Sequence, residues 1–183
     1  MRQPRSIRHN GKSLDKILES HLKFVKAQEG GVRADLSGAD LSRLNLRGVN
    51  LTGAILARAR LDGSDLHAAK LTMADLTHAS LQGADLRTSD LTEARLVEAD
   101  LTEANLSGAE LYRADLSHSV MRKAMLRAAV LRRANLRETD FRGADLESAR
   151  IEESDLTGTN LDGIDLTRVI VRGNTRGAEE AKG

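Results

Sequence analysis

Two histidines and two glutamates alternate along the chain at a constant interval of twenty residues. His78, Glu98, His118 and Glu138 follow Arg58 at this spacing. If the chain repeats its path every twenty residues, these side chains stack in one column, about 4.8 Å apart. Two histidines that flank a glutamate have the donor atoms for a metal ion. The alternating charges favour a ladder of cross-strand pairs instead, and no metal site is predicted.

No arrangement of residues typical of catalysis is found. Ser and Thr are abundant, but no motif ties a histidine to them, and no Gly-rich phosphate loop, H-E-x-x-H or G-x-S-x-G sequence occurs. The chain has no cysteine, which excludes thiolate catalysis, disulfides and Cys-type zinc sites. We therefore expect a protein that is not an enzyme and that needs no cofactor.

A basic segment is the second group with distinctive chemistry. Residues 116–142 carry seven basic and two acidic side chains, whereas residues 75–115 carry nine acidic and three basic ones. Basic groups beside exposed apolar ones suit a protein or anionic surface, so we predict a partner-binding site here. The alternative is that the basic and acidic segments pair with each other in solvent. The predicted site, named the basic belt, consists of Val120, Arg122, Lys123, Met125, Arg127, Val130, Arg132, Arg133 and Arg137.

The element that must position these groups is a repeat of five residues. Every fifth position from Leu36 to Val171 is apolar, and 24 of these 28 positions are Leu. The position two before each is Ala in 18 of 28 cases. Neither a strand, with a side-chain period of two, nor a helix, with a rotation of about 100° per residue, keeps such positions on one face. The chain must therefore turn once in every pentad and direct each leucine toward a common axis.

This pattern resembles that of the pentapeptide-repeat family, whose consensus is A-[D/N]-L-x-x. It is seen here in Ala34-Asp35-Leu36 and again in later repeats such as the one that ends at Leu106. The resemblance implies an all-β solenoid, a right-handed quadrilateral β-helix with four pentads per coil. The 28 repeats of residues 34–173 then give about seven coils.

The two ends of the array differ. Residues 13–28, within an N-terminal extension of residues 1–33, are predicted to form a capping helix that starts at Ser13 and stops before Gly30 and Gly31. Its apolar stripe is Leu14, Ile17, Leu18, Leu22 and Val25, with His21 at the edge. Residues 174–183 are predicted to be a polar tail. The last coil is unusually apolar, so a homodimer is predicted to form through Ile164, Val169, Ile170 and Val171.

Composition sets the remaining limits. No apolar run approaches the roughly 18 residues of a membrane span, and the N-terminus lacks the apolar core of a signal peptide, so a cytoplasmic protein without membrane contact is expected. Direct nucleic-acid binding is disfavoured, because acidic segments flank the basic belt and only Tyr112 lies near it for stacking.

Two functions remain open at this stage. The first is a scaffold or regulator that presents a rigid surface to a protein partner, as solenoids commonly do. The alternative comes from the best-understood branch of the pentapeptide-repeat family, whose members resemble a DNA duplex, bind type II topoisomerases such as gyrase and protect them from quinolones. This chain departs from that branch because its net charge is +1, no loop interrupts its repeats and it has no C-terminal helix after them.

Overall fold

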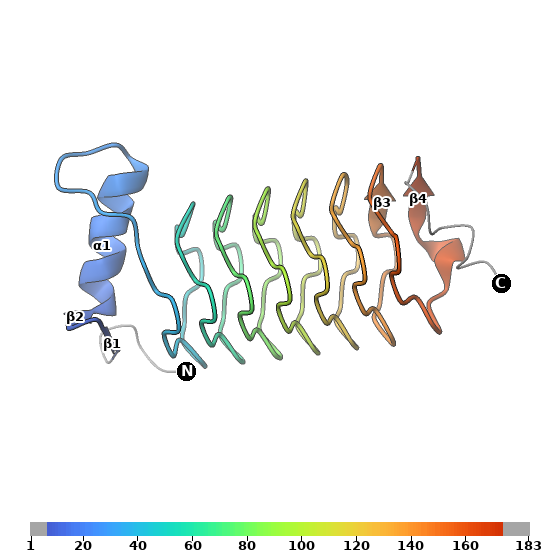
Figure 1. Cartoon of the computed structure of the whole chain (residues 1–183), viewed down its shortest axis with the longest axis horizontal. Helices are drawn as coiled ribbons and strands as arrows, with labels where there is room; N and C mark the ends of the chain where they lie inside the picture. Colours follow the sequence, from blue (N-terminus) through green and yellow to red (C-terminus); the bar gives the residue numbers. More distant parts are fainter. Residues whose placement is uncertain (1–6, 174–183) are drawn as a thin grey trace.

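The computed structural model describes residues 7–173, which form an elongated stack of coils with a helix at one end (Figure 1). Regular secondary structure is confined to the two ends, while each coil between them is built from turns and isolated β-bridges. The elements are, in chain order, β1 (Arg8–His9), β2 (Lys12–Ser13), α1 (Leu14–Val25), β3 (Arg150–Glu152), the 3-10 helix η2 (Leu166–Arg168) and β4 (Ile170–Arg172).

Parallel pairing at a constant offset holds the stack together. Twenty-two bridges join residues twenty apart, from Asp35↔Ile55 to Asp140↔Asn160. Strands β3 and β4 continue the same register, since Arg150 pairs with Ile170. An offset of twenty residues is four pentads, so each coil contains four repeats. The backbone groups of every coil are thus satisfied by the coils beside it, as a stacked β-architecture requires.

Each pentad ends in a tight turn. The Leu36 carbonyl accepts a hydrogen bond from the Ala39 N–H at 3.0 Å, and Gly38 between them has a φ of +67°. A positive φ recurs two residues after every apolar position from Leu36 to Val171 except Leu166, even where the residue is not glycine, as at Thr88. The Asp35 carboxylate accepts the Ser37 N–H at 3.0 Å, which explains the preference for Asp or Asn before each leucine. The polar positions of the repeat consensus therefore reflect what the turn requires of its residues.

The core is a narrow stack of inward leucine and alanine side chains. The inward leucines from Leu36 to Leu156 are buried, as are the substitutes Met121, Phe141 and Ile151, whereas Leu161 and Leu166 are only partly buried. Burial of apolar surface contributes roughly 25 cal/mol per Å², so this continuous column is the main source of stability. Packed side chains fill the axis of the rod, and function must therefore lie on its surface.

The N-terminal segment corrects two expectations. Helix α1 starts after Ser13 as expected but ends at Val25, not near residue 28. The reason is that the backbone turns at Lys26 and Ala27, where Ala27 has a φ of +51°. The predicted stripe packs on the core through Leu14, Ile17 and Leu18, but His21 is fully buried against the first coil while Leu22 is 39% exposed. The β1–β2 hairpin was not predicted.

The last coil departs from the regular geometry. Helix η2 replaces the usual bridge and turn, although β4 returns to register with Val171 opposite Ile151. Ile164 and Val169 are partly buried and pack against the core. The polar tail predicted for residues 174–183 lies outside the described residues.

Candidate interaction surfaces

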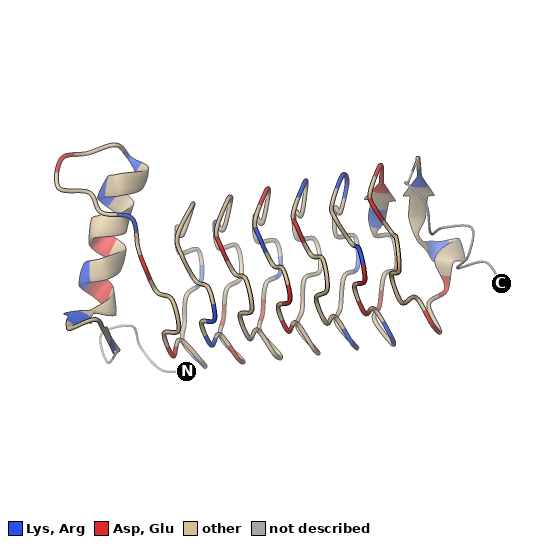
Figure 2. Cartoon of the chain, viewed as in Figure 1, with Lys and Arg blue, Asp and Glu red and all other residues tan. Residues whose placement is uncertain are grey.

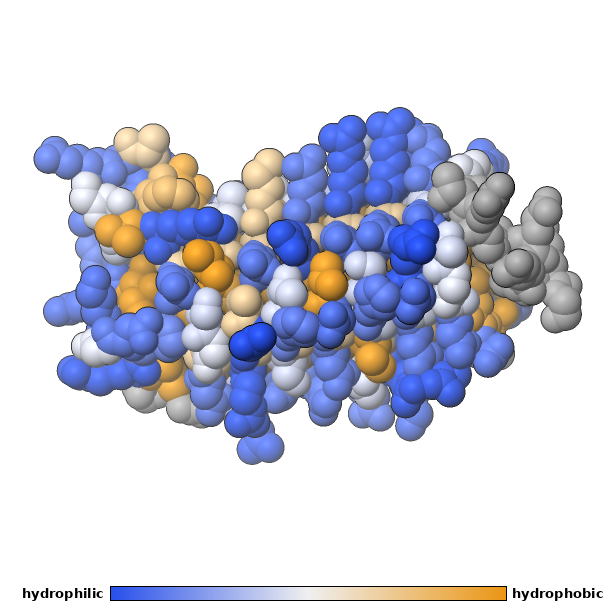
Figure 3. Space-filling view, in the orientation of Figure 1, coloured by the Kyte–Doolittle hydropathy of each residue, from blue (hydrophilic) through white to orange (hydrophobic). Residues whose placement is uncertain are grey.

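The basic belt lies on the outside of the rod and extends around it. Val120, Met125 and Val130 occupy bridge positions one pentad apart, so they fall on three successive sides of one coil. Met125 is 42% exposed, which leaves a large apolar side chain in solvent at a position where most pentads have Asp or Asn. Figure 3 shows one face of the molecule, which is largely hydrophilic, with hydrophobic side chains scattered along the rod and gathered at the end that carries α1.

The belt cations form ion pairs along the rod. Arg122 contacts Asp140 at 2.5 Å, Arg137 contacts Asp155 at 3.3 Å, and Arg127 contacts Asp145. In each pair the partners are eighteen residues apart. Each arginine directly follows an inward apolar residue, and each aspartate occupies the bridge position on the same side of the next coil. Charges of opposite sign thus lie side by side along the stack (Figure 2).

Two belt arginines converge on one carboxylate. At position 150, eighteen residues after Arg132, stands another cation, so Arg132 contacts Glu153 instead, at 2.8 Å. Arg133 contacts the same Glu153 at 2.6 Å. The two guanidinium groups hold the pKa of Glu153 below its ordinary value. Lys123, the remaining belt cation, lies 3.7 Å from Glu103 in the preceding coil. The pairing alternative accounts for these contacts, and partner binding by the belt stays a proposal.

The histidine–glutamate column has the predicted form. The Nδ1 atom of His78 lies 3.2 Å from Glu98, and that of His118 lies 3.1 Å from Glu138. Each histidine is therefore paired with the glutamate twenty residues later. Between residues 7 and 173, no group of three or more His, Asp or Glu side chains is placed to hold a metal ion.

The apolar last coil presents its predicted interface residues unevenly. Ile170 is 41% exposed, whereas Ile164, Val169 and Val171 are partly buried. The outer edge of this coil carries backbone N–H and C=O groups, and no further coil within residues 7–173 pairs with them. Whether two chains meet at this end is a matter for proposal.

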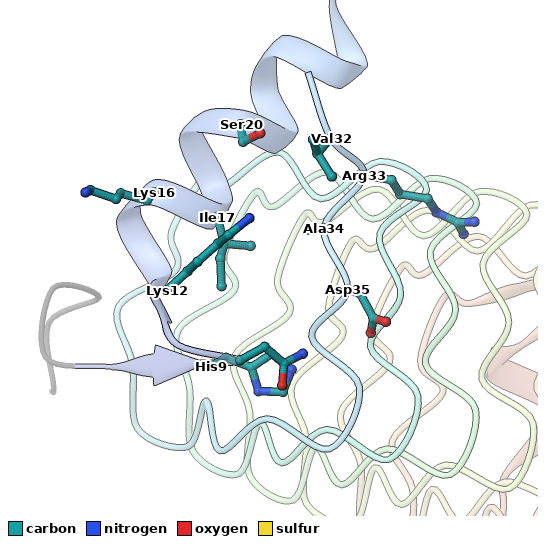
Figure 4. A pocket seen from close by; sticks show the side chains of 10 residues that line it. His9, Lys12, Lys16, Ile17, Ser20, Val32, Arg33, Ala34 and Asp35 are labelled. Atoms are coloured by element: carbon teal, nitrogen blue, oxygen red, sulfur yellow. The ribbon is translucent and has the colours of Figure 1, made fainter. Parts of the chain in front are cut away.

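The N-terminus contains a cleft that sequence reasoning missed. The β1–β2 hairpin, α1 and the segment leading into the first coil surround a space of about 580 Å³ (Figure 4). His9, Lys12, Lys16 and Arg33 line it together with one carboxylate, that of Asp35. The excess of basic residues in the N-terminal extension was a signal for such a site, but the hairpin that assembles it has no clear sequence pattern.

The sequence model of the pentapeptide-repeat family, which spans eight copies of the repeat, matches this chain over residues 32–67, 69–108, 109–147 and 134–173. The match covers most of the chain and coincides with the stacked coils described above. The chain therefore belongs to the pentapeptide-repeat family, and its fold is of the right-handed β-helix type. No match was found among curated protein sequences.

Three solved structures illustrate the likeness. HetL, a pentapeptide repeat protein involved in heterocyst differentiation regulation from the cyanobacterium Nostoc sp. strain PCC 7120, is 31% identical, with a TM-score of 0.61 over 77% of this chain and 67% of HetL. A pentapeptide repeat protein of the Arabidopsis thaliana thylakoid lumen is 32% identical, with a TM-score of 0.42 over 58% of this chain and 67% of its own. QnrB1, a plasmid-mediated fluoroquinolone resistance protein, is 22% identical, with a TM-score of 0.49 over 76% of this chain and 80% of its own. None of the helices within residues 7–173 has the length and apolar character to cross a membrane.

Proposed function

We propose that this chain is a non-enzymatic scaffold or regulator that presents a rigid rod to a protein partner. In this proposal, residues 34–173 form a quadrilateral β-helix of seven coils, and α1 caps its first coil in a cytoplasmic protein. The observation that carries the proposal is the basic belt, where outward apolar residues on three sides of one coil stand among ordered arginines.

Ion pairing within the belt supports binding because it fixes the arginine side chains in advance. A mobile arginine loses about 0.5–1.5 kcal/mol of side-chain entropy when a partner immobilises it, and a pre-paired one loses less. Each belt guanidinium retains donors that its carboxylate does not use, so a partner can add contacts without breaking the pair. The exposed Met125 side chain, in the middle of the basic belt, would supply the apolar contact with the partner. HetL, which is similar to this chain, is involved in regulation, and such a role suits a protein-binding rod.

The test replaces the belt's apolar residues with the type that the repeat itself uses. Val120, Met125 and Val130 are changed together to Asn, which occupies the equivalent bridge position at Asn105 and Asn135. The fold should persist, and partners captured from a lysate and quantified by mass spectrometry should be lost.

The matched control is Ile55→Asn, which makes the same kind of change at a bridge position outside the belt. Capture by this variant should equal that of the unaltered chain. Unchanged capture by the belt variant would show that the belt is solvated surface and would contradict the proposal.

We also propose that two chains associate through Ile164, Val169, Ile170 and Val171 of the last coil. Exposed Ile170 and an open coil edge support this proposal, because an unpaired edge can pair with another chain. Light scattering coupled to size exclusion should give twice the chain mass at micromolar concentration, and Ile170→Asn should shift it toward the monomer. A monomer for the unaltered chain would contradict the dimer.

Type II topoisomerase binding stays a prediction of the family resemblance. The likeness to QnrB1 is too distant to carry an argument about partners. A supercoiling assay with gyrase, with and without a quinolone, tests it directly. An absence of both inhibition and protection would remove this alternative.

A further inference from the structure

The cleft at the N-terminal end has an apolar floor that the described residues leave open. Ile17 of α1 and Val32 of the segment leading into the first coil turn toward the space (Figure 4). Val32 is 58% exposed, although it lies beside a packed core. A β-branched apolar side chain exposed to this extent inside a concave site favours a ligand with an apolar group of its own.

Cations surround this floor. The Lys12 side chain lies across the space and Lys16 extends from its rim, while Arg33 reaches away toward the next coil (Figure 4). With Asp35 as the carboxylate in the lining, the three permanent cations leave a net charge of +2. The Asp35 carboxylate is engaged by Ser37, whose N–H and hydroxyl donate to it at 3.0 and 2.6 Å.

The lysines of the cleft differ from the belt cations in their partners. Neither Lys12 nor Lys16 lies within ion-pair distance of a carboxylate among residues 7–173, whereas every belt cation does. Both also stand near the start of α1, where the partial positive charge of the helix dipole disfavours cations. An anionic ligand would relieve this repulsion, which makes the cleft more receptive to negative charge than the belt.

A second hollow of about 500 Å³ follows on the same side of the rod. Ser37 lines it, two residues after Asp35 of the first cleft, and it includes the cations Arg58 and Arg95. Neither arginine has an ion pair within residues 7–173. Arg33 of the first hollow extends to the next coil, where its Nε donates to the Gly53 carbonyl. The two arginines outnumber Asp75, the one carboxylate among the described residues of this lining, so an excess of positive charge continues from the cleft along this side.

We propose that the cleft binds an acidic peptide segment of a partner protein, with an apolar side chain on Ile17 and Val32 and its carboxylates toward Lys12, Lys16 and Arg33. The second hollow would receive the continuation of the same segment at Arg58 and Arg95. This inference rests on the proposed function only in making the chain a binder of proteins, because the cleft lies outside the basic belt.

A peptide fits better than the other anions. Free phosphate would not use the apolar floor, and its volume is far below that of the cleft. Single-stranded nucleic acid binds proteins largely by stacking on aromatic side chains. Among residues 7–173, neither hollow is lined by an aromatic side chain apart from the imidazoles of His9 and His78. A Glu-rich segment with one apolar residue matches both the charge and the floor.

The test measures fluorescence anisotropy of a labelled Glu-rich peptide with one central leucine, titrated with the full chain. Saturable binding is expected, and Lys12→Gln with Lys16→Gln should weaken it about tenfold, since the two exposed charges nearest the space are lost together. The control pair, Lys23→Gln with Lys26→Gln, removes the same charge from the other end of α1 and should leave the affinity unchanged. Circular dichroism should show the same folded spectrum for all variants.

Further probes separate the apolar contact from general attraction. A peptide with serine in place of the leucine should bind more weakly, and Val32→Thr should abolish that difference. The proposal would be overturned if the serine peptide, or a labelled single-stranded DNA, bound as tightly as the leucine peptide. It would also be overturned if the two double lysine variants lost affinity equally, or if no saturable binding were observed. The Val120, Met125 and Val130 variant should bind the peptide normally, so failure of the belt proposal and failure of the cleft proposal give different results.

Discussion

The Nδ1 atom of His21 accepts a hydrogen bond from the backbone N–H of Ala34 at 3.1 Å. Within the array the equivalent N–H closes the preceding turn, as Ala39 does with the Leu36 carbonyl. Ala34 is the first inward residue and has no such turn before it. A side chain of α1 therefore satisfies the first inward donor of the array, and because this nitrogen accepts, the ring proton must lie on Nε2.

Replacing His21 with leucine should destabilise the N-terminal end. The substitution leaves the Ala34 N–H buried without an acceptor, at a cost of about 1–3 kcal/mol that exceeds the gain from removing the buried Nε2–H, which has no hydrogen-bond partner within residues 7–173. Chemical denaturation should show this loss, and the Ala34 amide should exchange its hydrogen faster. His118→Leu, which alters an exposed ion pair, should change stability by less than about 0.5 kcal/mol. Equal effects of the two changes would contradict the role of His21.

The same hydrogen bond should make the N-terminal end sensitive to pH. Burial and, secondarily, the positive charge of Arg33 hold the pKa of His21 below its ordinary value of 6.5, while the Thr52 carbonyl acts in the opposite direction. Folding therefore favours the neutral ring, so its contribution to stability is complete above pH 6.5 and is lost as the pH falls below that value. Hydrogen exchange of α1 and of Ala34 should accelerate on acidification, and His21→Leu should remove the dependence. An unchanged profile in that variant would contradict it.

The N-terminal segment shows why a sequence pattern predicted the helix but not its contacts. Apolar spacing identified α1, yet the face that packs is set by the shape of the first coil, which accepts His21 and leaves Leu22 outside. Gly31 was expected to stop the helix. A Cβ atom there would lie 2.3 Å from the Phe24 nitrogen, so this glycine is required for close approach of the returning chain.

The belt could have been interpreted further from the sequence. Once four pentads form a coil, residues eighteen apart share a side, and Arg122 then faces Asp140. This offset follows from the register alone. It fails for Arg132, because Arg150 occupies the position eighteen residues later, and which nearby carboxylate the Arg132 side chain reaches instead depends on rotamers that no sequence pattern contains. The cleft could not be predicted from the repeat either, because the β1–β2 hairpin and the backbone turns that form it lie outside the periodic part of the sequence.

Thr88 should be a point where the fold can be stabilised. It has a φ of +53°, which is unfavourable for a β-branched residue, and its side chain has no hydrogen bond within residues 7–173 that would offset the cost. Thr88→Gly should raise the free energy of unfolding by about 0.5–1 kcal/mol, after the greater entropy of unfolded glycine is subtracted. The measurement is denaturant unfolding of the full chain.

The matched control is Thr92→Gly, in the next pentad, at a turn position whose φ is not positive. Glycine there raises the entropy of the unfolded chain and also removes the hydrogen bond between the Thr92 side chain and Asp90, so stability should fall by at least about 0.5–1 kcal/mol. Opposite signs for the two substitutions would support strain at Thr88. A loss of stability in both would show that the turn tolerates threonine without cost.

Two buried serines should respond oppositely to replacement by alanine. Ser89 donates its hydroxyl to the Leu86 carbonyl at 2.7 Å, whereas the Ser119 hydroxyl is buried with no partner within residues 7–173. Alanine is the usual residue at both positions of the repeat, so neither change should disturb packing. Ser89→Ala should cost about 1 kcal/mol for the lost hydrogen bond, and Ser119→Ala should stabilise by about 1 kcal/mol because it removes an unsatisfied polar group. Denaturant midpoints measured side by side decide the matter, and a loss of stability on Ser119→Ala would mean that this hydroxyl is hydrogen-bonded in solution.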